Sequence, residues 1–227
     1  MNITRRVGRS PHAAPDALRP YIYAERIVVH ASSRPERKWV VSATDVTFEL
    51  LDGTQAAAHA DDLQALHAEA CADDGDNAVP FADRFRVQRR QPGFALAVAR
   101  HGGYLVGYAF GMPLRPSTSW WRYLTTPLPE AITAEHPGRT FALAELLVRA
   151  SWRRQGIGQA LHDLILANRP EERATLTVPP AATPAQHAFR NWGWRKLGRT
   201  RGERGGEPVS DVLVTTLPLS AGRTLPR

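Results

Sequence analysis

The segment VRASWRRQGIGQ, residues 148–159, places glycines and arginines where a buried strand is expected to pass into a helix. The first N–H groups of a helix have no partner within it and lie at the positive end of its dipole, so they can bind an anion. Gly156 and Gly158 would let a phosphate approach the backbone closely. Residues 149–162 contain no acidic side chain, and three arginines stand beside the glycines: Arg149, Arg153 and Arg154. We therefore expect a phosphate site, the alternative being an ordinary turn with solvated arginines.

Glu145 is the residue best suited to proton transfer. It stands in FALAELLV, residues 141–148, a run of strand length that is otherwise apolar and typical of a central strand covered on both faces. Burial disfavours the charged form of a carboxylate, which would make this group a proton acceptor. The alternative is a structural glutamate paired with one of the many arginines.

Other kinds of site do not fit the sequence. A P-loop needs Gly-Lys followed by Ser or Thr, but Gln159-Ala160 follows Gly158, and a dinucleotide fingerprint needs a third glycine where Leu161 stands. Four histidines show no metal-ligand spacing with carboxylates or with the single cysteine: His59, His67, His101 and His162. We expect surface or packing roles for these histidines, and no metal.

The elements that would position these residues alternate between strand and helix patterns. Strands are predicted, from period-two alternation or short apolar runs, over residues 46–51, 94–100, 104–112, 141–148, 174–178 and 209–217. Helices are predicted, from apolar residues at helical spacing, over residues 61–72, 80–91, 156–169 and 183–192, with a short one at 129–135. Thr183-Pro184-Ala185-Gln186 predicts a helix start with a capping box. The order β-α-α-β-β-β-α-β-α-β predicts an α/β (α+β) sandwich around a mixed sheet.

The glycine segment resembles the signature of the GNAT superfamily of N-acetyltransferases, Gln/Arg-x-x-Gly-x-Gly/Ala after a central strand. Here it reads Arg153-Arg154-Gln155-Gly156-Ile157-Gly158. The strand ATLTV at residues 174–178 follows, and then the pair Gly193-Trp194 where GNAT proteins commonly have Gly-Phe. The resemblance implies a mixed, mainly antiparallel central sheet with helices on both faces.

The resemblance also divides the chain. It covers about residues 46–219, which would form one acyltransferase domain. Residues 1–45 lie outside it and are predicted to be a partly disordered N-terminal extension, and residues 220–227 a C-terminal tail.

The implied activity is transfer of an acetyl group from acetyl-CoA, the cosubstrate, to a primary amine of a small molecule, peptide or protein. Pyrophosphate would bind the glycine segment and pantetheine would pair along the strand before it, so the implied cofactor-binding residues are Leu146, Leu147, Val148, Arg153, Arg154, Gln155, Gly156, Ile157, Gly158 and Gln159. Attack on the thioester requires a neutral amine, and Glu145, or a water chain leading to it, is the candidate base. A backbone N–H near Val148 would stabilise the developing oxyanion.

Two positions depart from the GNAT pattern. Where these proteins often have a tyrosine that protonates the departing thiolate, this chain has Phe189, and Ala182 replaces an asparagine that often touches pantetheine. A phenyl ring cannot donate a proton, although a thiol pKa of about 8.5 makes the thiolate a tolerable leaving group. A CoA-binding protein without efficient turnover therefore remains an alternative.

The acceptor is not fixed by the sequence. The proline-containing stretch 113–140 carries an aromatic group, Trp120, Trp121 and Tyr123, which we predict to be substrate-binding as an apolar lid; the alternative is that these side chains pack on the sheet edge. GNAT proteins bind their acceptors with variable loops, and fold analogy does not specify the molecule.

The composition bears on two other classes of protein, those that bind nucleic acid and those that span a membrane. The chain has 227 residues, 29 Lys+Arg and 22 Asp+Glu, a net charge of +7. Only Lys38 and Lys196 are lysines, an arginine skew more typical of a GC-rich genome than of a nucleic-acid ligand. The less favoured nucleic-acid-binding module would use Arg190, Arg195, Lys196, Arg199, Arg201 and Arg204. The lone Cys71 and the absence of a long apolar run favour a soluble cytoplasmic protein without a membrane segment. The sequence does not fix the oligomeric state, for which a homodimer is one alternative.

Overall fold

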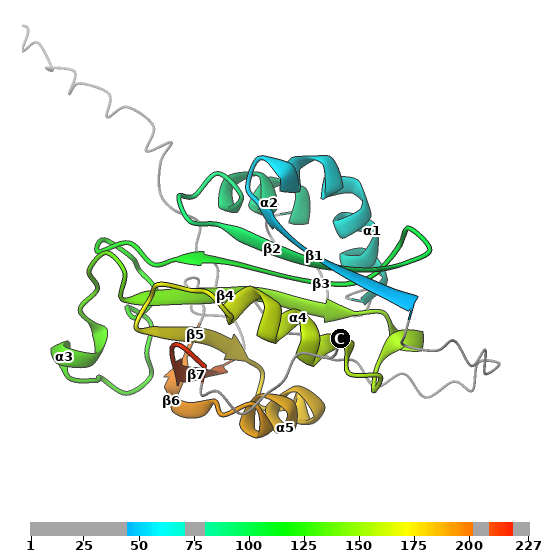
Figure 1. Ribbon diagram of the computed structural model, residues 1–227. Helices are drawn as coiled ribbons and strands as arrows, with labels where there is room; N and C mark the ends of the chain where they lie inside the picture. The colour runs from blue at the N-terminus through cyan, green and yellow to red at the C-terminus, as the bar shows by residue number, and fades with distance from the viewer. Residues whose placement is uncertain (1–44, 71–79, 202–208, 220–227) are drawn as a thin grey trace, which may run out of the picture.

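A computed structural model describes residues 45–70, 80–201 and 209–219 (Figure 1). Its sheet has seven strands in the order β1-β2-β3-β4-β5-β7-β6. Their bounds are β1 (Val46–Asp52), β2 (Ala95–His101), β3 (Tyr104–Pro113), β4 (Thr140–Val148), β5 (Arg173–Val178), β6 (Arg195–Thr200) and β7 (Ser210–Thr216). Neighbouring strands are antiparallel except β4 and β5, which run parallel. Cys71, the tail at 220–227 and residues 1–44 of the predicted extension lie outside the described residues.

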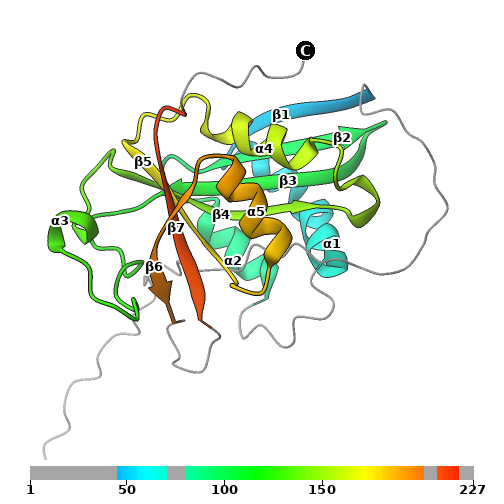
Figure 2. The same cartoon turned by 90° about the horizontal axis from the view of Figure 1, so that it is seen from below.

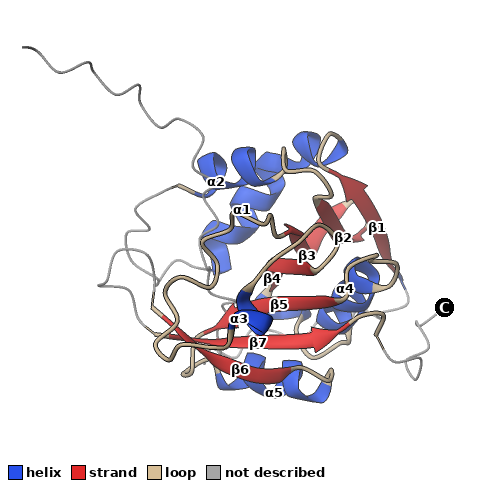
Figure 3. Ribbon diagram, turned by 90° about the vertical axis from the view of Figure 1, so that its left-hand side faces the viewer, coloured by secondary structure: helices blue, strands red, loops and turns tan. Residues whose placement is uncertain are grey.

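Helices cover both faces of this sheet. They are the 3-10 helices η2 (Gln55–His59) and η3 (Ala150–Trp152) and the α-helices α1 (Ala60–Ala70), α2 (Phe81–Gln88), α3 (Glu130–Thr133), α4 (Ile157–Leu166) and α5 (Thr183–Asn191). Helices α1 and α2 lie on one side, and α4 and α5 lie on the other (Figures 1 and 2). Figure 3 shows the strands as one twisted layer between them. The predicted mixed, mainly antiparallel sheet with helices on both faces is confirmed.

Three apolar clusters join the layers. Helix α4 buries Ile157, Leu161 and Ile165, spaced i, i+4 and i+8, against one face of the sheet together with residues of α5. The cluster under α1 and α2 includes Leu63 and Phe85. The third lies beneath the stretch between β3 and β4 and consists of Leu114, Trp120, Trp121, Ala142, Val212 and Val214.

Two local predictions were incomplete or wrong. Strand β6 was not predicted, because its sequence RKLGRT is charged and contains a glycine; it is an edge strand whose exposed residues include Arg195 and Lys196. The capping box at Thr183 is absent, since no side chain caps α5. Gln186 instead donates from Nε2 to the Pro179 carbonyl at 3.3 Å and to Asp211 Oδ2 at 3.2 Å.

Candidate active site

The pairing between β4 and β5 is short, and it ends where the predicted site begins. The two strands pair only from Thr140 to Ala142. Beyond that point β4 continues to pair with β3 as far as Val148, and β5 continues with β7 as far as Val178. The edges of β4 and β5 that face each other therefore leave backbone N–H and C=O groups without a strand partner, and such groups need other partners. We refer to this opening as the splay.

A β-bulge in β4 decides which way Glu145 points. Phe110 is opposite Glu145 and Gly111 is opposite Leu143, so Ala144 is an extra residue in β4. Side chains alternate along a regular strand, and Glu145 would then share the face of Leu143, which packs with α4. The extra residue turns Glu145 to the α1 and α2 face instead.

On that face Glu145 has polar partners from three elements. Oε1 accepts a hydrogen bond from the Tyr108 hydroxyl on β3 and lies 2.9 Å from Nδ1 of His67 on α1. Oε2 is 3.8 Å from the Arg84 guanidinium on α2. A hydrogen-bonded partner set offsets the cost of burying a carboxylate. The pairing with Arg84 is the one expected if Glu145 were a structural glutamate. The contacts with His67 and Tyr108 were not expected on that alternative.

The glycine segment has the geometry of an anion site. Gly156 caps α4 with φ 82°, a left-handed conformation that favours glycine, and the first intrahelical bond runs from Ala160 N to Gly156 O. The N–H groups of residues 157–159 precede that bond, and no acceptor contacts them among the described residues. Arg154 also has a positive φ of 64°, which is strained for a residue with a side chain, and its side chain is exposed.

Arg153 stands at the edge of the splay. Its Nε donates to the Val148 carbonyl at 3.0 Å. The N–H of the same peptide unit, that of Arg149, bonds to Val106 on β3. The Val148 carbonyl therefore points away from β3, toward the splay. Burial lowers the pKa of the Arg153 guanidinium, and no carboxylate pairs with it in the part of the chain that the structure describes. A desolvated cation of this kind suits an anionic ligand.

Arg149, predicted to join the phosphate cluster, is engaged elsewhere. Its Nε donates to the Leu105 carbonyl at 2.8 Å, it forms an ion pair with Glu69 on α1, and its guanidinium lies 4.4 Å from the centre of the Tyr104 ring. Burial lowers the pKa of Arg149, while the negative charge of Asp62 acts in the opposite direction. This arginine ties the segment to α1 and β3.

The predicted lid residues are mostly buried. Trp120 is 6% exposed and Trp121 is 8% exposed. The Trp121 indole donates to Glu135 Oε1 at 2.9 Å and lines a surface cleft of about 500 Å³. The Tyr123 carbonyl accepts bonds from Thr200 and Arg201 next to β6. These contacts favour the packing alternative for the two tryptophans.

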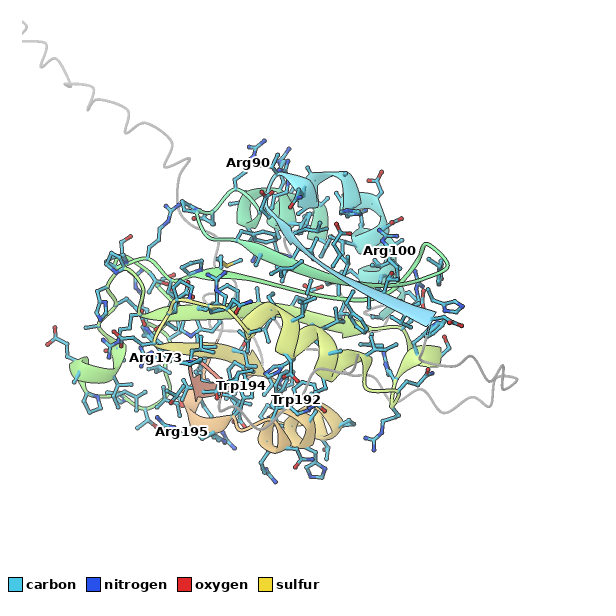
Figure 4. The ribbon with its side chains drawn as sticks, in the orientation of Figure 1. Arg90, Arg100, Arg173, Trp192, Trp194 and Arg195 are labelled. Atoms are coloured by element: carbon cyan, nitrogen blue, oxygen red, sulfur yellow. The ribbon has the colours of Figure 1, made fainter. Side chains whose placement is uncertain are left out.

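An aromatic cluster fills the space between α4 and α5. Phe189 is 1% exposed, and the centroid of its ring lies 5.3 Å from that of Trp192 and 5.7 Å from that of Trp194. The two tryptophans, labelled in Figure 4, follow α5 in the chain. His162 accepts from the Trp194 indole at 2.9 Å and lies 2.7 Å from Asp163. The outer edge of the Trp192 ring would be 3.7 Å from a Cβ placed on Gly158, so the cluster reaches the start of α4.

The sequence did not predict the polar contacts of two histidines in this region. His67 and His162 bind Glu145 and Trp194 respectively, rather than serving only as surface or packing residues. Helical spacing could place His67 on the buried face of α1, but no local signal revealed its distant partner on β4.

Comparison with known proteins identifies the family. The model of the acetyltransferase (GNAT) family matches residues 56–194, more than half of the chain. The chain belongs to the GNAT acetyltransferase family. The match contains the splay, Glu145 and the glycine segment of this GNAT protein, and it ends before β6.

Solved structures of other acetyltransferases share the fold. An aminoglycoside 6'-N-acetyltransferase complexed with coenzyme A is 13% identical, with 75% of this chain and 96% of that chain covered and a TM-score of 0.54. Arabidopsis thaliana NAA60 in complex with acetyl-CoA is 15% identical, with 76% and 98% covered and a TM-score of 0.54. The ribosomal-protein-S18-alanine N-acetyltransferase from Escherichia coli is 14% identical, with 79% and 98% covered and a TM-score of 0.51. At these identities the likeness shows the fold alone.

No curated protein matches this sequence. Within residues 45–70, 80–201 and 209–219, none of the helices has the length and apolar character needed to span a membrane, and no three His, Cys, Asp or Glu side chains gather as a metal site.

Proposed function

We propose that this GNAT protein is an N-acetyltransferase that moves an acetyl group from acetyl-CoA to a primary amine of a small molecule, peptide or protein. The observation that carries the proposal is the end of β4–β5 pairing at Ala142, beside N–H groups at the start of α4 that have no acceptor among the described residues. Pantetheine amides can bind an open strand edge much as another strand would, and a pyrophosphate can bind the helix start.

In this proposal the chain holds acetyl-CoA by two adjacent surfaces. Residues 146–148 offer the strand edge, and residues 153–159 offer backbone N–H groups with the positive charges of Arg153 and Arg154. The Val148 carbonyl already accepts from Arg153, but its second lone pair can accept an amide N–H as well. Acetyl-CoA supplies an activated acyl group when bound.

Glu145 is the proposed proton acceptor. The ammonium proton first passes to the carboxylate, and the neutral amine nitrogen then bonds to the acyl carbon. The C–S bond breaks to release thiolate, the nitrogen gives up its second proton to the thiolate, and Glu145 returns its proton to solvent. A backbone N–H near Val148 would stabilise the oxyanion. The support is position: Glu145 lies on β4 next to the strand edge proposed for pantetheine, and the bulge turns it toward the opposite face from α4.

A second candidate is a CoA-binding protein without efficient turnover. Phe189 favours it, because this buried ring sits where the family often has a proton-donating tyrosine. The basic nucleic-acid surface is less well supported, since Lys196 and Arg199 both pair with Asp211, at 2.6 Å and 3.0 Å. These pairs reduce the free positive charge on β6.

The test mixes purified protein with acetyl-CoA and three amines: kanamycin, spermidine, and a short peptide with a free N-terminal alanine. Release of CoA thiol is followed together with the mass of the acetylated amine. Transfer to any of the three supports the proposal. Calorimetric binding of acetyl-CoA with no transfer to any of them favours the second candidate, and no binding rejects both.

A further inference from the structure

We propose that the surface cleft beside α3 is a second acceptor subsite, which binds an apolar residue of a peptide some distance from the amine to be acetylated. The assignment rests on the proposed acetyl transfer, and it makes the acceptor a peptide or protein. The cleft has a volume of about 500 Å³, which is within the usual size of ligand sites. Most of its lining is apolar: Pro116, Trp121, Leu124, Pro127, Leu128 and Ala134.

Glu135 supplies a buried polar group to this cleft. Its side chain has no exposed surface. Oε1 accepts hydrogen bonds from the Trp121 indole, the Thr140 hydroxyl and the Arg173 guanidinium, each at 2.9 Å. Oε2 is buried and has no hydrogen-bond partner among the described residues. A buried acceptor without a donor costs free energy, and an N–H group of a ligand would supply that donor.

The charges around the cleft favour a neutral donor at Glu135 and an anion at the rim. Arg173 already balances the charge of Glu135, and Arg139 adds a positive charge beside α3, where it donates to a backbone carbonyl. Arg122 lines the cleft, is exposed, and has no carboxylate partner in the part of the chain that the structure describes. The backbone N–H of an apolar residue, followed by an acidic side chain, fits these groups better than a second cation would.

The cleft lies on the same face of the sheet as Glu145. Trp121 packs with Ala142 of β4, whereas the next residue of that strand, Leu143, packs with α4 on the opposite face. The bulge turns Glu145 to the face of Ala142. An acceptor whose amine meets Glu145 on this face can therefore extend back along β4 toward the cleft.

The separation of the two places sets the length of the acceptor. Thr140, whose hydroxyl contacts Glu135, is five positions before Glu145 on β4. Five strand residues rise about 17 Å, and about five residues of an extended peptide span the same length. A small amine is too short to contact Glu145 and the cleft together, whereas a peptide with its N-terminus at Glu145 is long enough.

The probe is the octapeptide Ala-Gly-Gly-Gly-Gly-Leu-Asp-Gly, compared with the dipeptide Ala-Gly, each with acetyl-CoA. We expect the wild type to use the octapeptide with a kcat/KM roughly tenfold above that of the dipeptide, as for one added charge-assisted contact. Replacing the leucine of the octapeptide by glycine should remove part of this advantage. The matched peptide leaves the protein unchanged, so its result does not depend on how a variant folds.

Arg122→Glu tests the rim of the cleft in the protein. The variant should lose the advantage of the octapeptide over the dipeptide, because it reverses the charge that would face the aspartate. Arg115→Glu is the matched control, since Arg115 is exposed in the same stretch and does not line the cleft. Both variants change the net charge equally, so a difference between them reports the cleft alone.

Binding of the N-acetylated octapeptide gives a readout without catalysis, because this peptide has no reactive amine. Calorimetry should show it binding to the wild type and to Arg115→Glu, and roughly tenfold more weakly to Arg122→Glu.

Equal use of the two peptides, equal behaviour of the two variants, or transfer to kanamycin or spermidine but to neither peptide would overturn the subsite while acetyl transfer stands. If the wild type acetylates no amine, the acceptor role falls with the proposed function. Binding of the N-acetylated peptide that depends on Arg122 would then still show a peptide site at the cleft.

Discussion

The glycine segment and the Glu145 cluster differ in how their polar groups are satisfied. Among the described residues, the N–H groups at the start of α4 have no acceptor and the desolvated Arg153 has no carboxylate partner, and an anion would supply both. Around Glu145, partners from α1, α2 and β3 already occupy the carboxylate. Backbone N–H groups without a hydrogen-bond partner therefore indicate where a ligand binds. A carboxylate that already has its hydrogen-bond partners gives no such indication, and only the solvent exposure of those partners bears on its chemistry.

The two regions also differ in how the chain builds them. The glycine segment is contiguous, so its residue types report its function directly. His67 and Glu145 are 78 positions apart, and Tyr108 is 37 positions from Glu145. Only the fold brings them together, with the Ala144 bulge turning the carboxylate to the correct face.

Breaking the glycine segment should have the largest effect. Gly158→Asp adds a like charge at the proposed pyrophosphate site and should abolish acetyl-CoA binding. At an acetyl-CoA concentration of about 100 times the Kd, the wild type should gain about 2.7 kcal/mol of stability, a rise in Tm of roughly 5–10 °C. Differential scanning fluorimetry should show this rise for the wild type and none for the variant.

Gly158→Ala is the matched control for that experiment. A Cβ at Gly158 meets its nearest atoms at 3.7 Å, an ordinary contact, so both variants should fold. The alanine variant should keep part of the affinity, because it adds no charge. Undiminished binding by Gly158→Asp would remove the basis for the anion site.

Breaking the Glu145 cluster should affect rate rather than cosubstrate affinity. Glu145→Gln should lower acetyl transfer at neutral pH by roughly 10²–10⁴, the usual range for losing a general base. Steady-state kinetics and calorimetry would report the two quantities separately. A variant that unfolds, for want of a counterion for Arg84, or one that turns over at the wild-type rate, would assign Glu145 a structural role or move the base elsewhere.

Arg153 and Arg149 are close in the sequence, but we expect only Arg153 to bind the ligand and Arg149 to stabilise the fold. Arg153→Gln should weaken acetyl-CoA binding roughly tenfold, as expected for one lost charge-assisted hydrogen bond. Arg149→Gln should leave that affinity unchanged and lower the free energy of unfolding by about 1–3 kcal/mol, because its partners are Glu69 and the Leu105 carbonyl. Equal effects of the two variants on affinity would contradict this division.

The smallest effect on acetyl transfer is expected from Phe189→Tyr. Phe189→Tyr adds a hydroxyl to the aromatic cluster near the splay and should raise the transfer rate by less than about tenfold, or about 1.4 kcal/mol. Phe189→Ala should instead destabilise the fold by about 3–5 kcal/mol, since the ring is buried. A much larger gain from tyrosine in a stopped-flow assay would favour the CoA-binding alternative.

The features that the sequence predicted correctly were those that depend on residues close together in the chain. The order of elements and the hairpin of β2 and β3 followed from apolar periodicity and a glycine turn, and the family followed from the glycine segment. Strand β6 was missed because an edge strand can be as charged as a loop. The bulge at Ala144 and the contact of His67 with Glu145 depend on pairing between distant segments, which periodicity does not report.

The central claim is that acetyl-CoA binds across the splay with its pyrophosphate on the start of α4. A crystal structure of the protein with CoA tests it most directly. We predict pyrophosphate oxygens within hydrogen-bond distance of the N–H groups of residues 154–159, and pantetheine alongside residues 146–148 of β4. CoA bound at another surface, or no CoA in crystals grown at saturating concentration, would contradict the account.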